Sequence, residues 1–452
     1  MNVLGLTITI ILIFVILKMP RRWAVLGVVS GVIYLTQGQE VNLGGINFMA
    51  IRFIEIVGFY RVIARKEFSI SKLNSVDKYF LLFSSVYLFI FLVRSMVEPS
   101  FTESRMYQIG LFVDGTLSYF TFRGLLKDPE EFNQFLRDMV FLMMPFSMFL
   151  IVEAVTGKNF FSVMGGVPET PILRDGYYRC QGSFRHAITA GSLGATMMPL
   201  FIYLRASFEG RLRGTVGILI CMVIIIASHS SGPLMGFAAG ITAWMCWRWR
   251  KKMRTVRWFI AGSLVSLHLI MKAPVWFIIA RVSDVLGGDG WHRANLIDKF
   301  VNNFKDWWLM GMPLEKTANW AATKMPWDAV DVTNEYILIG LTGGLISLVL
   351  FIILLKKYYQ ILGNSMKKIR NVQNSKQDEL LLWGLGSSLV GHIVNLIAVT
   401  YFDQFYVMWY MTLAIVSSIT ICYCNDTVII NPGNLIAINT DSTNNYGMPR
   451  HI

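Results

Sequence analysis

The chain has 452 residues, of which 54% are hydrophobic and 15% charged, and its formal net charge is +13. An ordinary soluble domain carries about 25% charged residues, whereas here the apolar residues form runs of about 16 to 22, the length that spans a hydrocarbon core of about 30 Å. These runs are apolar on all sides, which excludes a large soluble helical protein, because its helices need polar faces. The basic residues gather between the runs, so nucleic acid is not an expected partner.

The apolar runs predict an all-α polytopic membrane protein with about 12–13 transmembrane helices, built as a single transmembrane domain over residues 1–424. A polar tail follows over residues 425–452. The third run contains Arg52 and Glu55, which are three residues apart and are expected to pair on one helix face. The candidate spans, in chain order, are approximately 3–18, 23–37, 45–62, 79–97, 107–124, 138–156, 187–205, 214–228, 232–248, 257–272, 332–355, 379–398 and 404–424.

Clusters of lysine and arginine give the orientation of the chain. They follow the first, third, fifth, seventh, ninth and eleventh runs, so that every second loop is basic. Since basic loops stay in the cytoplasm, the first residue is expected outside and the tail over 425–452 inside. The same alternation puts the two longest connections, about 157–186 and 273–331, on the external face, where they form a cap of loops and helices.

The connection over 273–331 is rich in tryptophan, which is not the composition of a disordered segment. Within it, Leu296, Phe300 and Phe304 recur at helical spacing and are followed by Trp307 and Trp308. Such a stripe predicts a helix in the membrane interface, with its apolar face on the membrane or on the helix bundle.

The connection over 157–186 ends in an unusual group of basic residues. The positive-inside rule depletes short external loops of arginine, yet residues 174–186 include Arg174, Arg179, Arg185 and His186. Guanidinium groups bind phosphate oxygens through two parallel hydrogen bonds, so this segment predicts an anion site at the outer membrane surface. The alternatives are contact with lipid headgroups and structural pairing with Asp175.

The second external connection and the run after it supply further candidates. His292 is a candidate general base, because free histidine exchanges its proton near neutral pH, although a lone histidine beside an arginine is more often structural. The turn over 228–233 could bring His229 to the same face, but a polar hairpin before a helix that starts with proline is favoured. The candidates for substrate contact here are Arg281, Arg293, Asp331, Asn334 and Tyr336.

Other features narrow the class of protein. The sequence has no P-loop, no dinucleotide-binding glycine motif and no HExxH, and no cytoplasmic domain large enough for a nucleotide sugar. No metal site or cofactor is expected, so an enzyme of this kind needs a donor already in the membrane, activated by a phosphate leaving group. The charges within spans, including Asp114, Glu153 and His392, are candidates for ion or substrate pathways or for structural pairing, and they keep a transporter as an alternative.

Three stretches of the sequence match the motifs of a known family in their order. Residues 179–191 (RCQGSFRHAITAG) contain an Arg-x-x-Gly-x-Phe loop that enters an apolar run. Residues 228–236 (SHSSGPLMG) form a serine- and glycine-containing turn, and residues 331–345 (DVTNEYILIGLTGGL) contain Asn-x-Tyr before a glycine-rich run. In these motifs, and in the long connection before the third, the chain resembles the bacterial O-antigen ligase and polymerase superfamily of lipid-linked glycan transferases.

The resemblance implies a GT-C-like membrane fold and a glycosyltransferase that requires no metal. Its donor would be an undecaprenyl-diphosphate-linked glycan, its acceptor a glycan or lipid A-core, and its surroundings the lipids of the bacterial inner membrane, with the active face periplasmic. Arg179 would be catalytic by its motif position, and the external arginines would hold the diphosphate and stabilise the leaving group. Arg281 and Arg293 would be the counterparts of arginines in the family's long loop.

One position departs from the family's pattern. Ligases typically carry histidine before Asn-x-Tyr, where this chain has Thr333, and the difference favours a polymerase over a ligase. Either His186 or His292 is expected to replace that histidine in catalysis, or positioning and charge stabilisation suffice. The alternative function is a polysaccharide or lipid-linked glycan transporter or flippase, for which inverted repeats and a site at mid-membrane would be typical.

Overall fold

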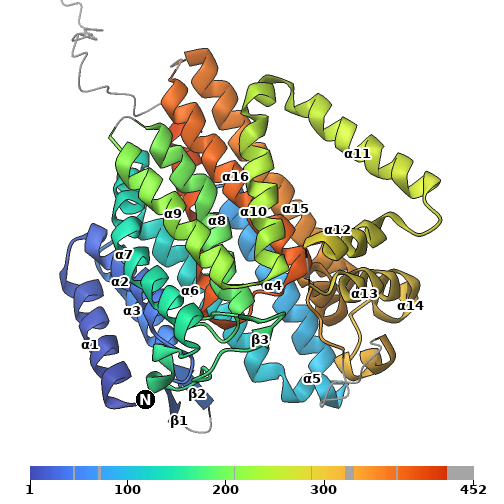
Figure 1. Cartoon of the computed structure of the whole chain (residues 1–452), viewed down its shortest axis with the longest axis horizontal. Coiled ribbons are helices and arrows are strands. Elements are labelled where there is room, and N and C mark those ends of the chain that lie inside the picture. Colours follow the sequence, from blue (N-terminus) through green and yellow to red (C-terminus); the bar gives the residue numbers. More distant parts are fainter. Residues whose placement is uncertain are drawn as a thin grey trace, which may run out of the picture.

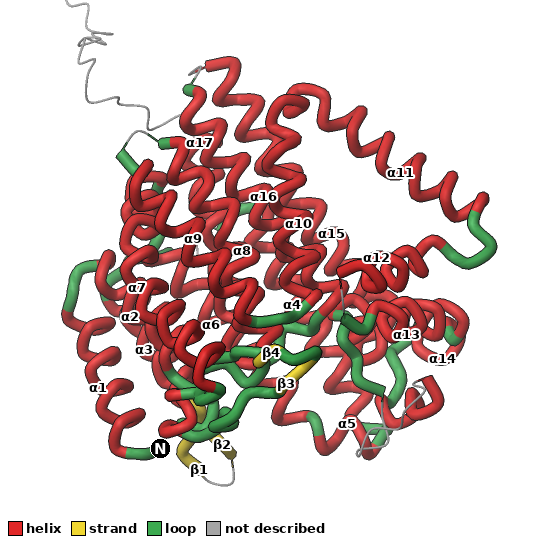
Figure 2. Tube along the Cα trace, viewed as in Figure 1, coloured by secondary structure: helices red, strands yellow, loops and turns green. Residues whose placement is uncertain are grey.

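The computed structural model describes residues 1–424 apart from 44–45, 70–72, 208, 287, 321–329 and 373–374. The tail over 425–452, expected in the cytoplasm, lies outside the described residues. Helices make up most of the described chain, and two short strand pairs lie towards the end of the bundle where the N-terminus is found (Figure 1, Figure 2). The all-α polytopic architecture predicted from the sequence is confirmed.

The main helices are α1 (Val3–Lys18), α2 (Arg21–Tyr34), α3 (Ala50–Ala64), α4 (Ser75–Ser95), α6 (Arg105–Leu125), α7 (Pro129–Thr156), α8 (Ala187–Ala206), α9 (Arg211–Ala227), α10 (Ser231–Met245), α11 (Met253–Ile270), α15 (Glu335–Val372), α16 (Lys376–Ala398) and α17 (Tyr406–Cys424). The shorter elements are α5 (Pro99–Glu103), α12 (Ile278–Leu286), α13 (Gly290–Asn302), α14 (Phe304–Trp307), β1 (Glu40–Leu43), β2 (Ile46–Met49), β3 (Leu173–Arg174) and β4 (Tyr177–Tyr178). Most residues of α8 and α17 are buried, so these two helices lie at the centre of the bundle.

A helix overlaps each predicted span, but not every helix could cross a bilayer by itself. Within the described residues, six helices are long and apolar enough to span a membrane. The number rises to seven if the pair Ser231–Ile270 and Val275–Val282, which is bent by 98°, counts as one span. Length and composition therefore support six to seven of the 12–13 predicted crossings.

The predicted span over 45–62 differs from the structure at its start and in its charges. Residues 46–49 form β2, antiparallel to β1, before α3 begins. Arg52 forms an ion pair of 2.9 Å with Asp114 of α6, while Glu55 accepts a hydrogen bond of 2.6 Å from Ser118. The expected pairing of Arg52 with Glu55 is wrong, because the neighbouring helix α6 offers each charge its own partner.

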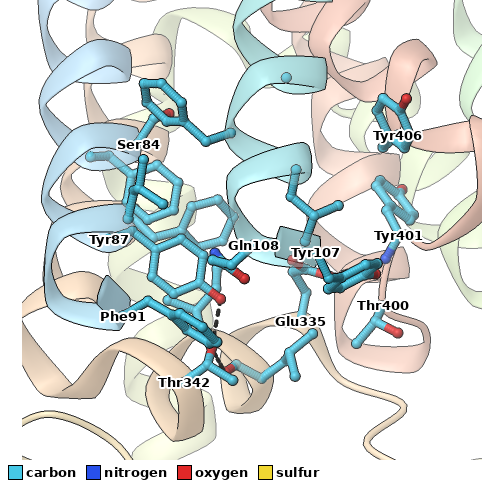
Figure 3. A pocket seen from close by; sticks show the side chains of 18 of the residues that line it. Ser84, Tyr87, Phe91, Tyr107, Gln108, Glu335, Thr342, Thr400, Tyr401 and Tyr406 are labelled. Carbon is cyan, nitrogen blue, oxygen red and sulfur yellow. Dashed lines mark hydrogen bonds between the residues drawn. The ribbon is translucent and has the colours of Figure 1, made fainter. Parts of the chain in front are cut away.

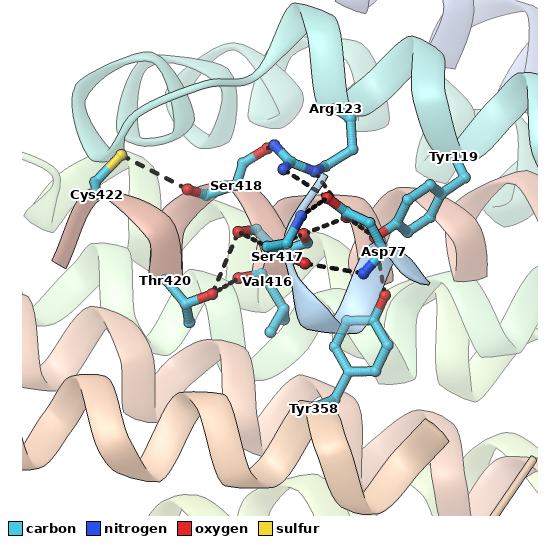
Figure 4. A network of polar contacts seen from close by, with 10 residues as sticks. Asp77, Tyr119, Arg123, Tyr358, Val416, Ser417, Ser418, Thr420 and Cys422 are labelled. Atoms are coloured by element: carbon cyan, nitrogen blue, oxygen red, sulfur yellow. Dashed lines mark hydrogen bonds and ion pairs between the residues drawn. The ribbon is translucent and has the colours of Figure 1, made fainter. Parts of the chain in front are cut away.

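A buried polar network joins four helices, α4, α6, α15 and α17, at the end of the bundle predicted to face the cytoplasm (Figure 4). The carboxylate of Asp77 on α4 is fully buried and forms an ion pair of 2.9 Å with Arg123 on α6. The same carboxylate accepts hydrogen bonds from Tyr119 (2.5 Å) and from Ser417 on α17 (2.6 Å). Removing one member of such a buried pair costs about 3–5 kcal/mol, because the other charge is left without compensation.

The external connection over 273–331 is helical where the apolar stripe predicts a helix. Leu296 and Phe300 of α13 and Trp307 of α14 are buried against Ile337 and Leu341 of α15, and together they form a second apolar core. Leu296, Phe300 and Trp307 of the stripe therefore pack on the bundle, one of its two expected positions, while Phe304 and Trp308 are exposed.

Helix α11, which follows the predicted cytoplasmic cluster of basic residues, leaves the bundle. Figure 1 shows it running outward from the end of α10, with α12 leading back. None of its residues is buried, and Trp258 and Phe259 are 70% and 75% exposed. Exposed apolar surface of this extent on a membrane protein is suited to contact with lipid tails.

Candidate functional site

The loop that carries the predicted anion-binding arginines is anchored to α7. The carboxylate of Glu153, near the end of this helix, accepts hydrogen bonds from the backbone N–H groups of Gln181 (3.0 Å) and Gly182 (2.9 Å). Glu153 is itself buried. Of the two roles open to it from sequence, the structure gives it the structural one: it fixes the backbone directly after Arg179.

Arg179 reaches from this loop to the N-terminus of α10. Its Nη2 atom donates to Oγ of Ser230, the residue before the helix, over 3.4 Å. Its Nε atom is buried and has no hydrogen-bond partner among the described residues. A buried N–H without an acceptor costs free energy, so the geometry indicates an acceptor from outside the chain.

Arg293 approaches the same helix end from α13. Its side chain is buried, and its Nη1 donates to Oγ of Ser231 over 3.2 Å, one residue along from the partner of Arg179. Gly288 makes this close approach possible, because it has a φ of +101° and an added Cβ would lie 2.0 Å from Oγ of Ser231. The structure thus brings together the loop over 157–186, the turn over 228–231 and the start of α13.

The turn is a tight hairpin, and it also brings His229 to the loop that carries the arginines, the alternative that was not favoured from the sequence. His229 has a positive φ of 40° and its ring stacks on that of Tyr177 in the loop over 157–186, with centroids 4.7 Å apart. This contact adds a further attachment between the turn and the loop that carries the arginines.

Arg174, Arg179 and Arg293 influence one another electrostatically, and we call them the arginine cluster. Arg174 also forms an ion pair of 3.7 Å with Asp175, the pairing that the sequence left open as an alternative. Burial, the larger cause, and the charge of Arg174 both lower the pKa of Arg179. Burial also lowers the pKa of Arg293; Asp289 opposes this effect, while Arg174 and Arg179 add to it. The three guanidinium groups therefore repel one another, and an anion between them would relieve both the repulsion and the cost of burial.

The N-terminus of α10 adds a partial positive charge to the arginine cluster. The side chain of Ser230 makes no capping hydrogen bond to this helix. The first N–H groups of a helix have no partner within it, and with the helix dipole they favour an anion. The oxygens of a diphosphate suit both kinds of donor, and the same donors would stabilise the charge that develops as a diphosphate leaves.

Two predicted substrate-binding arginines lie elsewhere. Arg185 is exposed, its backbone N–H donates to Oδ2 of Asp403 over 2.6 Å, and its charge acts on Asp403 and Tyr107. Arg281 is exposed on α12. Their contacts with a substrate stay predictions.

Both candidate histidines take part in local structure. Nδ1 of His186 accepts a hydrogen bond from the backbone N–H of Ile188 over 3.1 Å and so caps α8. Burial, and then the charge of Arg179, lower the pKa of His186 to about 4, so this ring is neutral near pH 7. Nε2 of His292 lies 2.9 Å from the backbone oxygen of Asp331. Their catalytic roles stay predictions.

The Asn-x-Tyr motif holds the start of α15. Oδ1 of Asn334 accepts hydrogen bonds from the backbone N–H groups of Tyr336 (3.0 Å) and of the following residue (3.2 Å). The hydroxyl of Tyr336 donates to a backbone carbonyl of α16 over 3.0 Å. Asp331 is exposed just before this segment. The structure therefore gives Asn334 and Tyr336 positioning contacts, and direct substrate contact by these residues stays a prediction.

A cavity of about 260 Å³ lies between α4, α6, α15 and α17 (Figure 3). Its lining is rich in aromatic side chains, and Glu335, the first residue of α15, is among the lining residues. Sequence reasoning passed over Glu335, and over the two serines that meet Arg179 and Arg293. Glu335, Ser230 and Ser231 all lie inside sequence motifs that were singled out, which could have drawn attention to them. The spacing of residues in the sequence, however, does not show which way a side chain faces.

No model of a known protein family matches this chain, and no curated protein matches its sequence significantly. Among the residues that the structure describes, no group of three or more histidine, cysteine, aspartate or glutamate side chains could hold a metal ion. The function is therefore argued from the geometry of the arginine cluster and its surroundings.

Proposed function

We propose that this chain is a membrane glycosyltransferase that moves a glycan from undecaprenyl diphosphate to an acceptor hydroxyl at the external face of the bacterial inner membrane. The observation that carries the proposal is the meeting of Arg179 and Arg293 at the uncapped N-terminus of α10, with the charge of Arg174 acting on both. Its acceptor is a growing glycan, as for an O-antigen or exopolysaccharide polymerase, or lipid A-core, as for a ligase.

The chemistry of the site supports transfer from a diphosphate donor. When the bond between the sugar and the diphosphate breaks, negative charge grows on the departing oxygen, and fixed positive groups lower the free energy of that transition state. The arginine cluster provides such groups, and the pKa values of Arg179 and Arg293, although lowered, belong to groups that stay protonated near neutrality.

The location of the arginine cluster also fits a lipid-linked donor. The cluster lies at one end of the helix bundle, on the face that the basic loops predict to be external. A diphosphate carried on a polyprenyl chain is confined to the membrane surface, so a site at the ends of the helices meets it without a separate soluble domain.

The proposal is tested with the purified full-length protein in nanodiscs and an undecaprenyl-diphosphate-linked oligosaccharide. We expect release of undecaprenyl diphosphate together with growth or transfer of the glycan, without added nucleotide and in the presence of a metal chelator. Arg179→Ala should slow this release by about 10²–10³-fold while it leaves the protein folded. Movement of the intact donor across vesicles, with no release of diphosphate, would instead identify a flippase.

A further inference from the structure

The cavity beside α15 has the surface that a sugar ring requires. Its walls include the rings of Tyr107, Tyr401, Tyr406, Trp409 and Tyr410. A pyranose has apolar C–H faces and a rim of hydroxyl groups, so it packs against aromatic faces and needs hydrogen-bonding groups at its edge. Tyrosine and tryptophan offer an apolar face and a polar atom in one side chain.

Polar side chains are placed among these rings. The hydroxyl of Tyr87 lies 2.6 Å from Oγ1 of Thr342, and Gln108 lies beside this pair (Figure 3). Ser84 and Thr400 also line the cavity. A space of about 260 Å³ with an aromatic wall and a few convergent polar groups is typical of a small-ligand pocket and is large enough for one sugar unit.

Two carboxylates line the cavity, Glu315, which is exposed, and Glu335, which lies next to these rings (Figure 3). Oε2 of Glu335 accepts a hydrogen bond from the backbone N–H of Tyr401 over 3.0 Å. No hydrogen bond to Oε1 and no ion pair of this carboxylate is found in the described part of the chain. The side chain is not needed to cap α15, because Asn334 already does so. One carboxylate oxygen therefore remains for a ligand.

The cavity adjoins the loop of the arginine cluster. Phe402, which lines it, makes an edge contact with the ring of His186, with centroids 6.3 Å apart. Tyr107 of the cavity is under the electrostatic influence of both Glu335 and Arg185. The end of the arginine loop, at His186, thus contacts the wall of the cavity through Phe402.

We infer that this cavity binds the acceptor sugar and that Glu335 is the general base for its hydroxyl group, an inference that rests on the proposed function. The acceptor oxygen attacks the anomeric carbon of the donor sugar while Glu335 takes the hydroxyl proton. The bond from that carbon to the diphosphate oxygen breaks, and its electron pair leaves on undecaprenyl diphosphate. The proton then passes from Glu335 to water, so that the new glycosidic bond and the lipid diphosphate are the products.

The assignment explains how the chain can work with Thr333 where ligases have histidine. A carboxylate two residues later, at the start of the same helix, supplies the base instead. Neither His186 nor His292 is then required to take the proton, which agrees with their hydrogen bonds to backbone groups.

The test compares Glu335→Gln and Glu335→Ala with the wild-type protein in nanodiscs, with Glu169→Gln as the control. Glu169 is an exposed carboxylate of the external loop, so its change is chemically the same but lies outside the cavity. We measure the affinity for undecaprenyl diphosphate, the rate of glycan transfer between pH 5 and 9, and the rate with added formate. Loss of a general base lowers kcat by about 10²–10⁴-fold.

We expect Glu335→Gln to bind undecaprenyl diphosphate as the wild type does and to lose transfer, with the acidic limb of the pH profile removed from any remaining rate. Formate should restore part of the rate to Glu335→Ala, where it fits the space of the missing carboxylate, and not to Glu335→Gln. Wild-type transfer by Glu335→Gln would overturn the inference while it leaves the proposed function intact. Loss of undecaprenyl diphosphate affinity in a folded Glu335→Gln protein would also overturn it, because the residue would then belong to the donor site.

A measurement on the unmodified protein decides the case if the variants fail to fold. A single displacement assisted by a base inverts the anomeric carbon, so the product linkage must have the opposite configuration to the donor. Retained configuration would contradict the role of Glu335 as base. If the wild-type protein releases no diphosphate from the donor at all, the proposed function fails and the inference fails with it.

Discussion

Replacement of Arg179 separates a role in leaving-group stabilisation from a role in folding. The one hydrogen bond described for its side chain is 3.4 Å long, to Ser230. A bond at that distance contributes at most about 1 kcal/mol, and loss of the repulsion from Arg174 and Arg293 offsets part of it. Arg179→Ala should therefore change the free energy of unfolding by less than about 1 kcal/mol.

The effect on transfer should be much larger. Two hydrogen bonds from the guanidinium to diphosphate oxygens would be lost, each worth about 1.5–3 kcal/mol because both partners are charged. A loss of about 3–4 kcal/mol in transition-state stabilisation lowers kcat by about 10²–10³-fold. Arg179→Lys keeps the charge but loses the paired donors, and it should cost about tenfold.

The assay is the initial rate of undecaprenyl diphosphate release at saturating donor, with thermal unfolding of the same preparations followed in parallel. Lys305→Ala is the matched control, since it removes an exposed positive charge from α14 on the same external cap. A folded Arg179→Ala protein with the wild-type kcat would refute the role of Arg179. An equal loss in Lys305→Ala would show that only the overall charge of this face matters.

Three further perturbations test the structure around the site. His186→Asn keeps a side chain that can cap α8, so transfer should fall less than about threefold. In the wild-type protein the pKa of His186 is lowered to about 4. The contribution of the neutral ring to the free energy of unfolding is therefore full above pH 6.5 and is lost as the pH falls towards 4, which unfolding curves across this range would show. Asp77→Asn leaves Arg123 buried without its counter-charge and should destabilise the protein by about 3–5 kcal/mol in thermal or denaturant unfolding. Gly288→Ala must displace Ser231, and it should weaken undecaprenyl diphosphate binding with little change in melting temperature, measured by titration and by calorimetry.

Much of the architecture follows from composition and periodicity. Apolar runs of membrane length and alternating basic loops predict the helices, because both are properties of the chain alone. The number of membrane crossings is harder to predict. The bend of 98° after α11 and the strand pair before α3 depend on tertiary contacts, which hydropathy does not reveal. The pairing of Arg52 was mispredicted for the same reason: Asp114 stands 62 residues away in the sequence.

The site was predictable in part. The arginines of 174–186 are conspicuous because external loops usually lack them, and two of them, Arg174 and Arg179, do gather with Arg293. Sequence spacing could not show that Arg185 lies beside Asp403, or that the side chain of Asn334 caps a helix. Nor could it show that Glu335, between two residues with structural contacts, lines a cavity.

The central claim is that the arginine cluster holds a diphosphate, and a cryo-EM structure of the nanodisc-bound protein with undecaprenyl diphosphate tests it most directly. We expect density for the diphosphate between Arg179 and Arg293, with its oxygens at the N-terminus of α10 and its polyprenyl chain directed into the membrane. The Nε atom of Arg179, which has no partner among the described residues, should then lie within hydrogen-bond distance of a phosphate oxygen. A diphosphate bound elsewhere, with this cluster unchanged, would contradict the account.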